Sequence, residues 1–207
     1  MPKITEASPI DELCERLTSS APRIKYGSAR ALCAIAQQSP EMLYPRFDFF
    51  VRLLDDDKRI LRWSAARILG SLAPADREDK LEAVLDRCLA PILGKELIAA
   101  ANAIRAAAPM ACAKPRLAGR IAAGILKVSR ARYATPECRN VAIGHAIESL
   151  NQFFPHIQNQ KTVVAFVEAQ LKNSRPATRK QAGEFLKRWG AGVAGEHPTP
   201  RAAVANL

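Results

Sequence analysis

The sequence predicts an all-α protein, a right-handed α-α superhelix of about five stacked helix pairs. Three observations support this fold class. Apolar residues recur with helical rather than alternating spacing, prolines and capping residues mark helix starts along the chain, and one set of apolar positions returns every 35 to 43 residues. No segment combines β-branched alternation with hairpin turns, so the sequence offers no source for a sheet.

Helix starts are marked by prolines and by short polar residues that can cap a first turn. The first is Ser8-Pro9, where the Ser8 hydroxyl can accept a backbone N–H bond and Asp11 completes a capping box. Further starts, enough for about ten helices, are predicted at Pro22, Pro40 or Pro45, Asp76 with Asp79, Pro115, Thr135-Pro136, Asn159 and Ser174. The stack is predicted to occupy residues 1–189, and residues 190–207, rich in glycine and proline, are expected to form a flexible tail.

The internal repeat pairs a large apolar residue with a small one a helical turn earlier. The equivalent large residues are Leu32, Leu69, Ile104, Ile147 and Leu186. The equivalent small residues are Ala29, Ala66, Ala101, Gly144 and Gly183. Because a small side chain beside a large one lets neighbouring helices approach closely, each such segment is predicted to be the second helix of a pair. A single pair cannot bury both of its apolar sides, so successive pairs are expected to stack.

Residues 53–72 resemble the HEAT repeat of the armadillo-like α-solenoid family. The matching positions are Asp56 in the turn, Leu61-Arg62 opening the second helix, then Ala65-Ala66 and Leu69-Gly70. The resemblance extends in period over nearly the whole chain, but other units depart from the motif: Leu97 and Asn140 stand in the arginine place of the third and fourth. It implies an inter-repeat ladder of turn aspartate and helix arginine, for which only Asp56 and Arg62 can be carried over as a pair.

The resemblance also implies that the second helices line the inner surface of the stack. The basic residues expected to form an inner-surface ladder there are Lys25, Arg30, Arg62, Arg67 and Arg179. Such a ladder could receive an extended acidic peptide. The alternative is that these side chains only bind the neighbouring turns of their own protein.

The net charge of +11 comes entirely from the C-terminal half. Residues 101–207 hold 16 basic and five acidic side chains, whereas residues 1–100 hold 15 of each. On the helix expected to open at Pro115, Arg116, Arg120, Lys127 and Arg130 fall within about 80° of one another and form a candidate anionic-partner surface. Nucleic acid bound there would be held without regard to its sequence. A merely solvated basic surface is the alternative.

Residues for catalysis or metal binding are few and scattered. The three histidines share no helical face, and there is no glycine-rich phosphate loop. The five cysteines form no C-x-x-C pair, and Cys33, Cys112 and Cys138 are expected to be small core residues. HEAT-like bacterial alkylpurine DNA glycosylases are similar in length, helicity and charge, but Trp63 and Trp189 match none of their motifs. We therefore expect no enzyme activity, cofactor or metal.

The sequence thus predicts a non-catalytic HEAT-repeat scaffold or adaptor that presents an extended surface to a protein partner, with an acidic protein as a candidate. Sequence-nonspecific nucleic-acid binding through the basic half is the alternative, and a HEAT-like glycosylase is third. No apolar run approaches the roughly 18 residues of a membrane helix, and no export signal is evident, so a cytoplasmic protein is expected. The oligomeric state stays open.

Overall fold

The computed structural model describes residues 9–194, which contain helices and turns and no strand. The first helices of the pairs are α1 (Pro9–Leu17), α3 (Pro40–Leu43) with α4 (Phe47–Leu53), α6 (Lys80–Leu89), α8 (Ala118–Leu126) and α10 (Gln160–Ala169). The second helices are α2 (Pro22–Gln38), α5 (Arg59–Leu72), α7 (Leu97–Ala113), α9 (Pro136–Phe153) and α11 (Pro176–Ala194). Short 3-10 turns extend several of them, among them η3 (Ala90–Leu93), η4 (Pro115–Leu117) and η5 (Lys127–Arg130).

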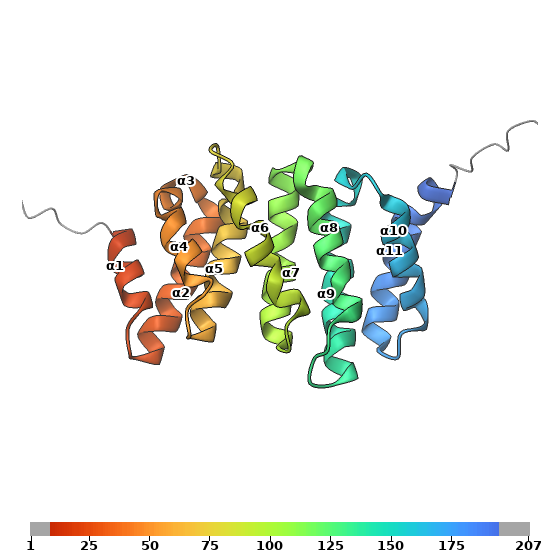
Figure 1. The fold of residues 1–207 in the computed structure, drawn as a ribbon, viewed down its shortest axis with the longest axis horizontal. Coiled ribbons are helices and arrows are strands. Elements are labelled where there is room, and N and C mark those ends of the chain that lie inside the picture. The colour runs from red at the N-terminus through yellow and green to blue at the C-terminus, as the bar shows by residue number, and fades with distance from the viewer. Residues whose placement is uncertain (1–8, 195–207) are drawn as a thin grey trace, which may run out of the picture.

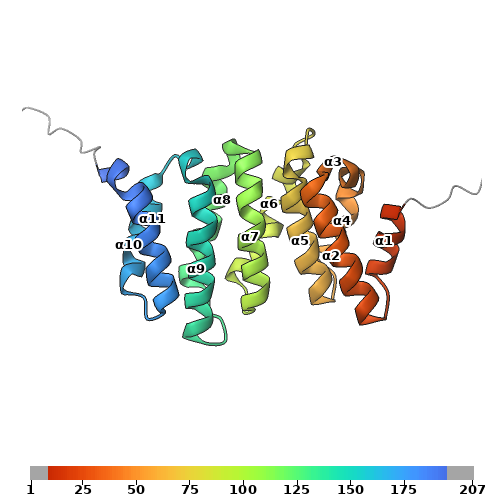
Figure 2. The same cartoon turned by 180° about the vertical axis from the view of Figure 1, so that it is seen from behind.

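The helix pairs stack in chain order into an elongated array with the two ends of the described chain far apart (Figure 1). Each second helix packs against the next one, so that α2, α5, α7, α9 and α11 form a continuous row. In Figure 2, where the molecule is turned by 180°, this row is the layer nearer the viewer, and the first helices form the layer behind it. The prediction of an all-α solenoid built from helix pairs is confirmed.

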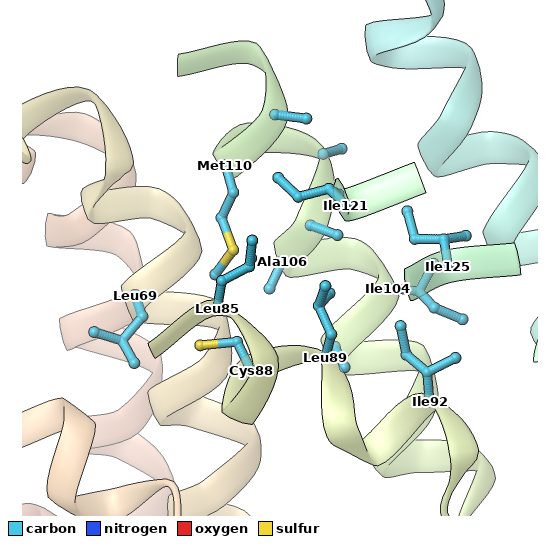
Figure 3. Close-up of a cluster of buried hydrophobic side chains, with 14 of the residues drawn as sticks. Leu69, Leu85, Cys88, Leu89, Ile92, Ile104, Ala106, Met110, Ile121 and Ile125 are labelled. Carbon is cyan, nitrogen blue, oxygen red and sulfur yellow. The ribbon is translucent and has the colours of Figure 1, made fainter. Parts of the chain in front are cut away.

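The core repeats from pair to pair as the register predicts. Leu32, Leu69, Ile104 and Ile147 are each at most 1% exposed. Figure 3 shows Leu69 of α5 and Ile104 of α7 on the two sides of a cluster that also takes residues from α6 and α8. Leu186, in the last helix, is partly buried and packs against the same core. Matching positions therefore occupy matching sites in consecutive layers.

Glycine allows the closest approach between neighbouring second helices. A Cβ added to Gly70 in α5 would lie 2.6 Å from the carbonyl oxygen of Ala106 in α7, so no other residue fits without a backbone shift. The same addition to Gly183 in α11 would meet nothing within 4 Å. Within the described chain, no further helix packs against that side of α11.

Most of the predicted helix starts are confirmed. Helices begin at Pro22, Pro40 and Pro136, and the side chains of Thr135 and Asn159 accept backbone N–H bonds at the starts of α9 and α10.

Three boundaries differ from the predictions, and a fourth cannot be compared because it lies outside the described residues. Ser8 lies outside the described residues, and Pro115 opens the turn η4 rather than an α-helix. The start predicted at Ser174 falls at Pro176, because Asn173 first forms a turn by accepting the N–H of Arg175. Helix α11 continues past residue 189 to Ala194, and the rest of the predicted tail lies outside the described residues.

The cysteines differ from the expected arrangement. Cys112 is exposed on α7, where its Sγ lies 3.8 Å from the carbonyl oxygen of Gln152 in α9, so its assignment to the core was wrong, and Cys33 and Cys138 are only partly buried. Cys14 and Cys88 are the buried thiols, and burial raises the pKa of Cys88 to about 12. Over residues 9–194, the helices lack the combination of length and apolarity that crossing a lipid bilayer requires.

Candidate partner-binding surface

Ion pairs join the first helices of successive repeats. Arg46 pairs with Asp11 across the first step of the stack, and Arg87 pairs with Asp55 across the second. Each arginine follows its acidic partner by roughly one repeat. The acidic residues of the N-terminal half therefore neutralise cations of the neighbouring repeat.

Two members of the predicted anionic-partner surface belong to this system of ion pairs. Arg116 pairs with Glu82, and its Nη2 lies 2.8 Å from Asp79 Oδ1. Arg120 Nη2 lies 2.5 Å from Asp86 Oδ2. The paired acids raise the pKa of Arg116, and hydrogen bonds from Lys114 and Arg116 lower the pKa of Asp79.

The other two members lie free of carboxylates. Lys127 and Arg130 are exposed in η5, and among the described residues they make no ion pair. The same holds for Arg132 and Arg139, which follow in the turn to α9 and at its first turns. The structure thus divides the predicted stripe into a paired half beside α6 and an unpaired half at the turn after α8.

The second helices carry a different charge pattern. Every charged side chain of α2, α5 and α7 is a cation, since these helices contain neither aspartate nor glutamate. We define the second-helix face as the solvent-facing side of the row α2, α5, α7, α9 and α11. On it Arg30, Arg67 and Arg105 are exposed and, within residues 9–194, form no ion pair. The N-terminal half is neutral overall, yet its two layers differ in charge.

His145 continues this row on α9. Its Nε2 lies 3.4 Å from Arg105 Nη2, and its Nδ1 lies 3.7 Å from Glu148 Oε2. Burial, and then the charge of Arg105, lower the pKa of His145, and the Glu148 carboxylate opposes them. Within the row, carboxylates occur only in α9 and α11. The most uniformly cationic part of the second-helix face therefore lies on α2, α5 and α7.

Two members of the predicted inner-surface ladder bind turns of their own repeat. Arg62 Nη1 donates to the carbonyl oxygens of Asp56 and Asp57 at 2.7 and 3.2 Å. Arg179 Nη1 does the same with Asn173 and Ser174 at 2.7 and 2.9 Å. Arg179 is nevertheless exposed. Of the remaining members, Arg30 and Arg67 are exposed and Lys25 is half-buried.

Asp56 and Arg62 therefore meet through the main chain inside one repeat. The Asp56 carboxylate itself accepts the N–H of Lys58 at 2.8 Å. A polar ladder between repeats occurs elsewhere, where Asn173 Nδ2 donates to Asn140 Oδ1 at 3.1 Å. These asparagines stand at the aspartate and arginine places of the motif, which is the signal that could have identified them.

A buried carboxylate that the sequence marked only as a helix start joins three repeats. Asp76, 1% exposed, accepts hydrogen bonds from the Tyr44 hydroxyl at 2.8 Å and from the N–H groups of Lys80 and Leu81 at 3.0 Å. Lys114 Nζ lies 3.8 Å from its Oδ2 and also donates to its carbonyl oxygen. Asp76 is thus a structural junction, since all of its contacts are internal.

A cavity of about 400 Å³ lies between repeats two and three, beside the first turns of α5 and α7. Its walls are Leu54, Arg62, Trp63, Ala66, Arg87, Pro91, Gly94, Lys95, Glu96 and Ala99. Trp189, the other tryptophan, is far away in α11, where it packs on Phe154 and donates to Asn151 Oδ1 at 2.7 Å. The two tryptophans share no site.

No protein-family model and no curated protein matches this sequence. Solved structures do. An engineered protein, Northeast Structural Genomics Consortium target OR329, gives a TM-score of 0.59 at 18% identity and covers 88% of this chain and 80% of its own. A second engineered protein, target OR366, gives 0.55 at 17% identity over 86% and 79%. A designed armadillo repeat protein in complex with the peptide (KR)4 gives 0.54 at 14% identity over 84% and 79%.

These likenesses agree with the stack of helix pairs described above. The chain has an armadillo/HEAT-like helical repeat fold.

Proposed function

We propose that this protein is a non-catalytic HEAT-repeat scaffold or adaptor that binds an acidic segment of a partner protein along its second-helix face. The observation that carries the proposal is the charge of α2, α5 and α7, whose charged side chains are all basic. Arg30, Arg67 and Arg105 are exposed there and unpaired among the described residues. The fold places carboxylates on the layer of first helices. An acidic partner segment would supply the negative charges that α2, α5 and α7 lack.

Rigid presentation is the proposed mechanism. Stacked helices hold the cations at fixed places before a partner arrives, so less ordering entropy is lost on binding. The designed armadillo repeat protein was solved with a basic peptide. The charge on α2, α5 and α7 here is also basic, so it would repel such a peptide and favour an acidic one.

Fluorescence anisotropy with labelled decaglutamate tests this proposal. We expect saturable binding at about 50 mM salt that weakens as salt is added, because exposed charges are screened. The triple variant Arg30→Glu, Arg67→Glu, Arg105→Glu should weaken binding at least about tenfold.

The matched control is Arg52→Glu, Arg77→Glu, Lys172→Glu. These residues are exposed outside the second-helix face, and the control changes the net charge by the same amount. It should retain most of the affinity, and thermal melts should show that both variants fold. No binding at low salt, or equal losses in the two triple variants, would contradict the proposal.

A second candidate function is sequence-nonspecific nucleic-acid binding at the unpaired half of the basic stripe. It is favoured by Lys127, Arg130, Arg132 and Arg139, exposed residues with no carboxylate partner in the described chain. Duplex DNA should then bind with a logarithmic salt slope of about −0.9 for each phosphate neutralised. Lys127→Glu with Arg130→Glu and Arg132→Glu should abolish that binding and spare decaglutamate binding. Unchanged DNA affinity would discard this site.

An enzyme is the third class of function. Incubation with alkylated DNA tests for a glycosylase, and release of a free base would overturn the non-catalytic assignment.

A further inference from the structure

The cavity between repeats two and three has an apolar floor. This floor is formed by Leu54, which directly follows α4, by Trp63 and Ala66 of α5, by Pro91 of η3 and by Ala99 of α7. Its volume of about 400 Å³ falls within the range of about 300–1,000 Å³ that is usual for sites that enclose a ligand. It is therefore large enough to bury one large apolar side chain.

The rim of the same cavity is cationic. Glu96 is its one carboxylate, and it lies 3.2 Å from Arg59 Nε. Arg87 is paired with Asp55. Among the described residues, Arg62 binds only carbonyl oxygens and exposed Lys95 makes no ion pair, so no carboxylate compensates the charge of these two cations. The rim thus favours a carboxylate beside whatever fills the floor.

The cavity adjoins the second-helix face. Trp63 in its wall and exposed Arg67 are four residues apart on α5, so their side chains lie on the same side of that helix, one turn apart. Ala99 in the opposite wall lies in the second-helix row as well, near the start of α7. A peptide held by Arg67 would therefore lie beside the opening.

We infer that this cavity is the anchor pocket for one large apolar side chain of the acidic partner segment, with flanking carboxylates at Lys95 and Arg62. The inference rests on the proposed function and names the sequence character of the partner: an apolar residue set among acidic ones. Charge would then supply attraction along the face, and burial in the pocket would supply specificity.

Calorimetry with two peptides separates these contributions. One heptapeptide has phenylalanine between two runs of three glutamates, and the other has alanine at that place. The phenylalanine peptide should bind at least about tenfold more tightly, as burial of a large apolar side chain predicts. If both peptides bind equally, the pocket inference is wrong and the proposed function survives. If neither binds, the proposed function fails as well.

Variants test whether the cavity is the source of the difference in affinity between the two peptides. Ala99→Leu fills the cavity from a partly exposed position and should remove the advantage of the phenylalanine peptide while leaving the alanine peptide unchanged. Ala34→Leu, on the exposed side of α2, is the matched control and should keep the advantage. Arg67→Glu should weaken both peptides alike. Retention of the advantage in Ala99→Leu would overturn the assignment of the cavity.

Tryptophan fluorescence gives a second reading that needs no change in the cavity. In Trp189→Phe, Trp63 is the only tryptophan left of the two. Its emission should shift on binding the phenylalanine peptide and stay constant with the alanine peptide. Equal responses to the two peptides would contradict the inference.

Discussion

Arg62 donates to the main-chain carbonyl of Asp56 at 2.7 Å and thereby ties the start of α5 to the turn before it. Arg179 makes the same contact with Asn173, also at 2.7 Å. In both turns the side chain of the first residue accepts the N–H two positions later. The turn and the arginine therefore form one local unit that joins the two helices of a pair.

Loss of the Arg62 contact should destabilise the protein. Arg62→Ala removes two charge-assisted hydrogen bonds and is expected to lower the free energy of unfolding by about 2 kcal/mol, measured by urea denaturation. Arg62→Lys should recover only part of this, because lysine lacks the guanidinium geometry. Arg30→Ala, exposed and unpaired in the described chain, should change stability by less than about 0.5 kcal/mol. Equal effects at the two positions would refute this role.

Asp76 should be essential to the junction of three repeats. Asp76→Asn removes the buried one of the two carboxylates beside Lys114 and disturbs bonds from Tyr44, Lys80 and Leu81, with an expected loss of about 3 kcal/mol in the free energy of unfolding.

Asp79→Asn is the comparison for Asp76→Asn. Asp79 is exposed at φ 56°, a left-handed conformation that asparagine tolerates, so its loss should be clearly smaller. Chemical denaturation of both variants decides between them. A larger loss for Asp79→Asn would show that the junction depends on the surface pairs.

Glycine should matter where second helices touch and not at the end of the stack. Gly70→Ala brings a methyl group against the Ala106 backbone and should cost about 1–3 kcal/mol. Gly183→Ala meets no neighbour and should stabilise α11 by up to about 1 kcal/mol, because alanine favours helix. Thermal melts of the two variants should move in opposite directions. Stabilisation by Gly70→Ala would be inconsistent with close packing of α5 on α7.

His145 should make stability depend on pH. Its pKa in the folded protein lies below the usual 6.5, chiefly because of burial and then because of Arg105. The unfolded chain therefore binds the proton more readily, so this contribution to stability is present above about pH 6.5 and declines as the pH falls toward the folded pKa.

Denaturation at about pH 7.5 and about pH 5.5 tests the contribution of His145. His145→Asn should show a smaller decrease between the two values than the unmutated protein. An NMR titration that placed the folded pKa above 6.5 would reverse the sign and contradict the prediction.

The fold could be predicted from the sequence because the signals that indicate it are local or periodic. Proline and capping residues mark the starts of α2, α3, α9 and α10. The register of Leu32, Leu69, Ile104 and Ile147 follows from the small residue that precedes each of them by one helical turn. The position of α11 was less predictable, since Asn173 forms a turn of its own before Pro176.

The partners of the charged residues could not be predicted in the same way. Arg116 and Glu82 are 34 residues apart, so a helical wheel shows Arg116 as free when it is paired with the preceding repeat. The cavity beside Trp63 likewise depends on four elements meeting in space. The cationic character of α2, α5 and α7 was visible in principle, because counting carboxylates helix by helix rather than by halves of the chain identifies it.

The most direct measurement of the central claim is an amide NMR titration with unlabelled decaglutamate at about 50 mM salt. Binding along the second-helix face should shift the amide signals around Arg30, Arg67 and Arg105 in α2, α5 and α7 and leave those of α1, α4 and α6 unchanged. Shifts confined to the first helices, or none at all, would contradict the claim.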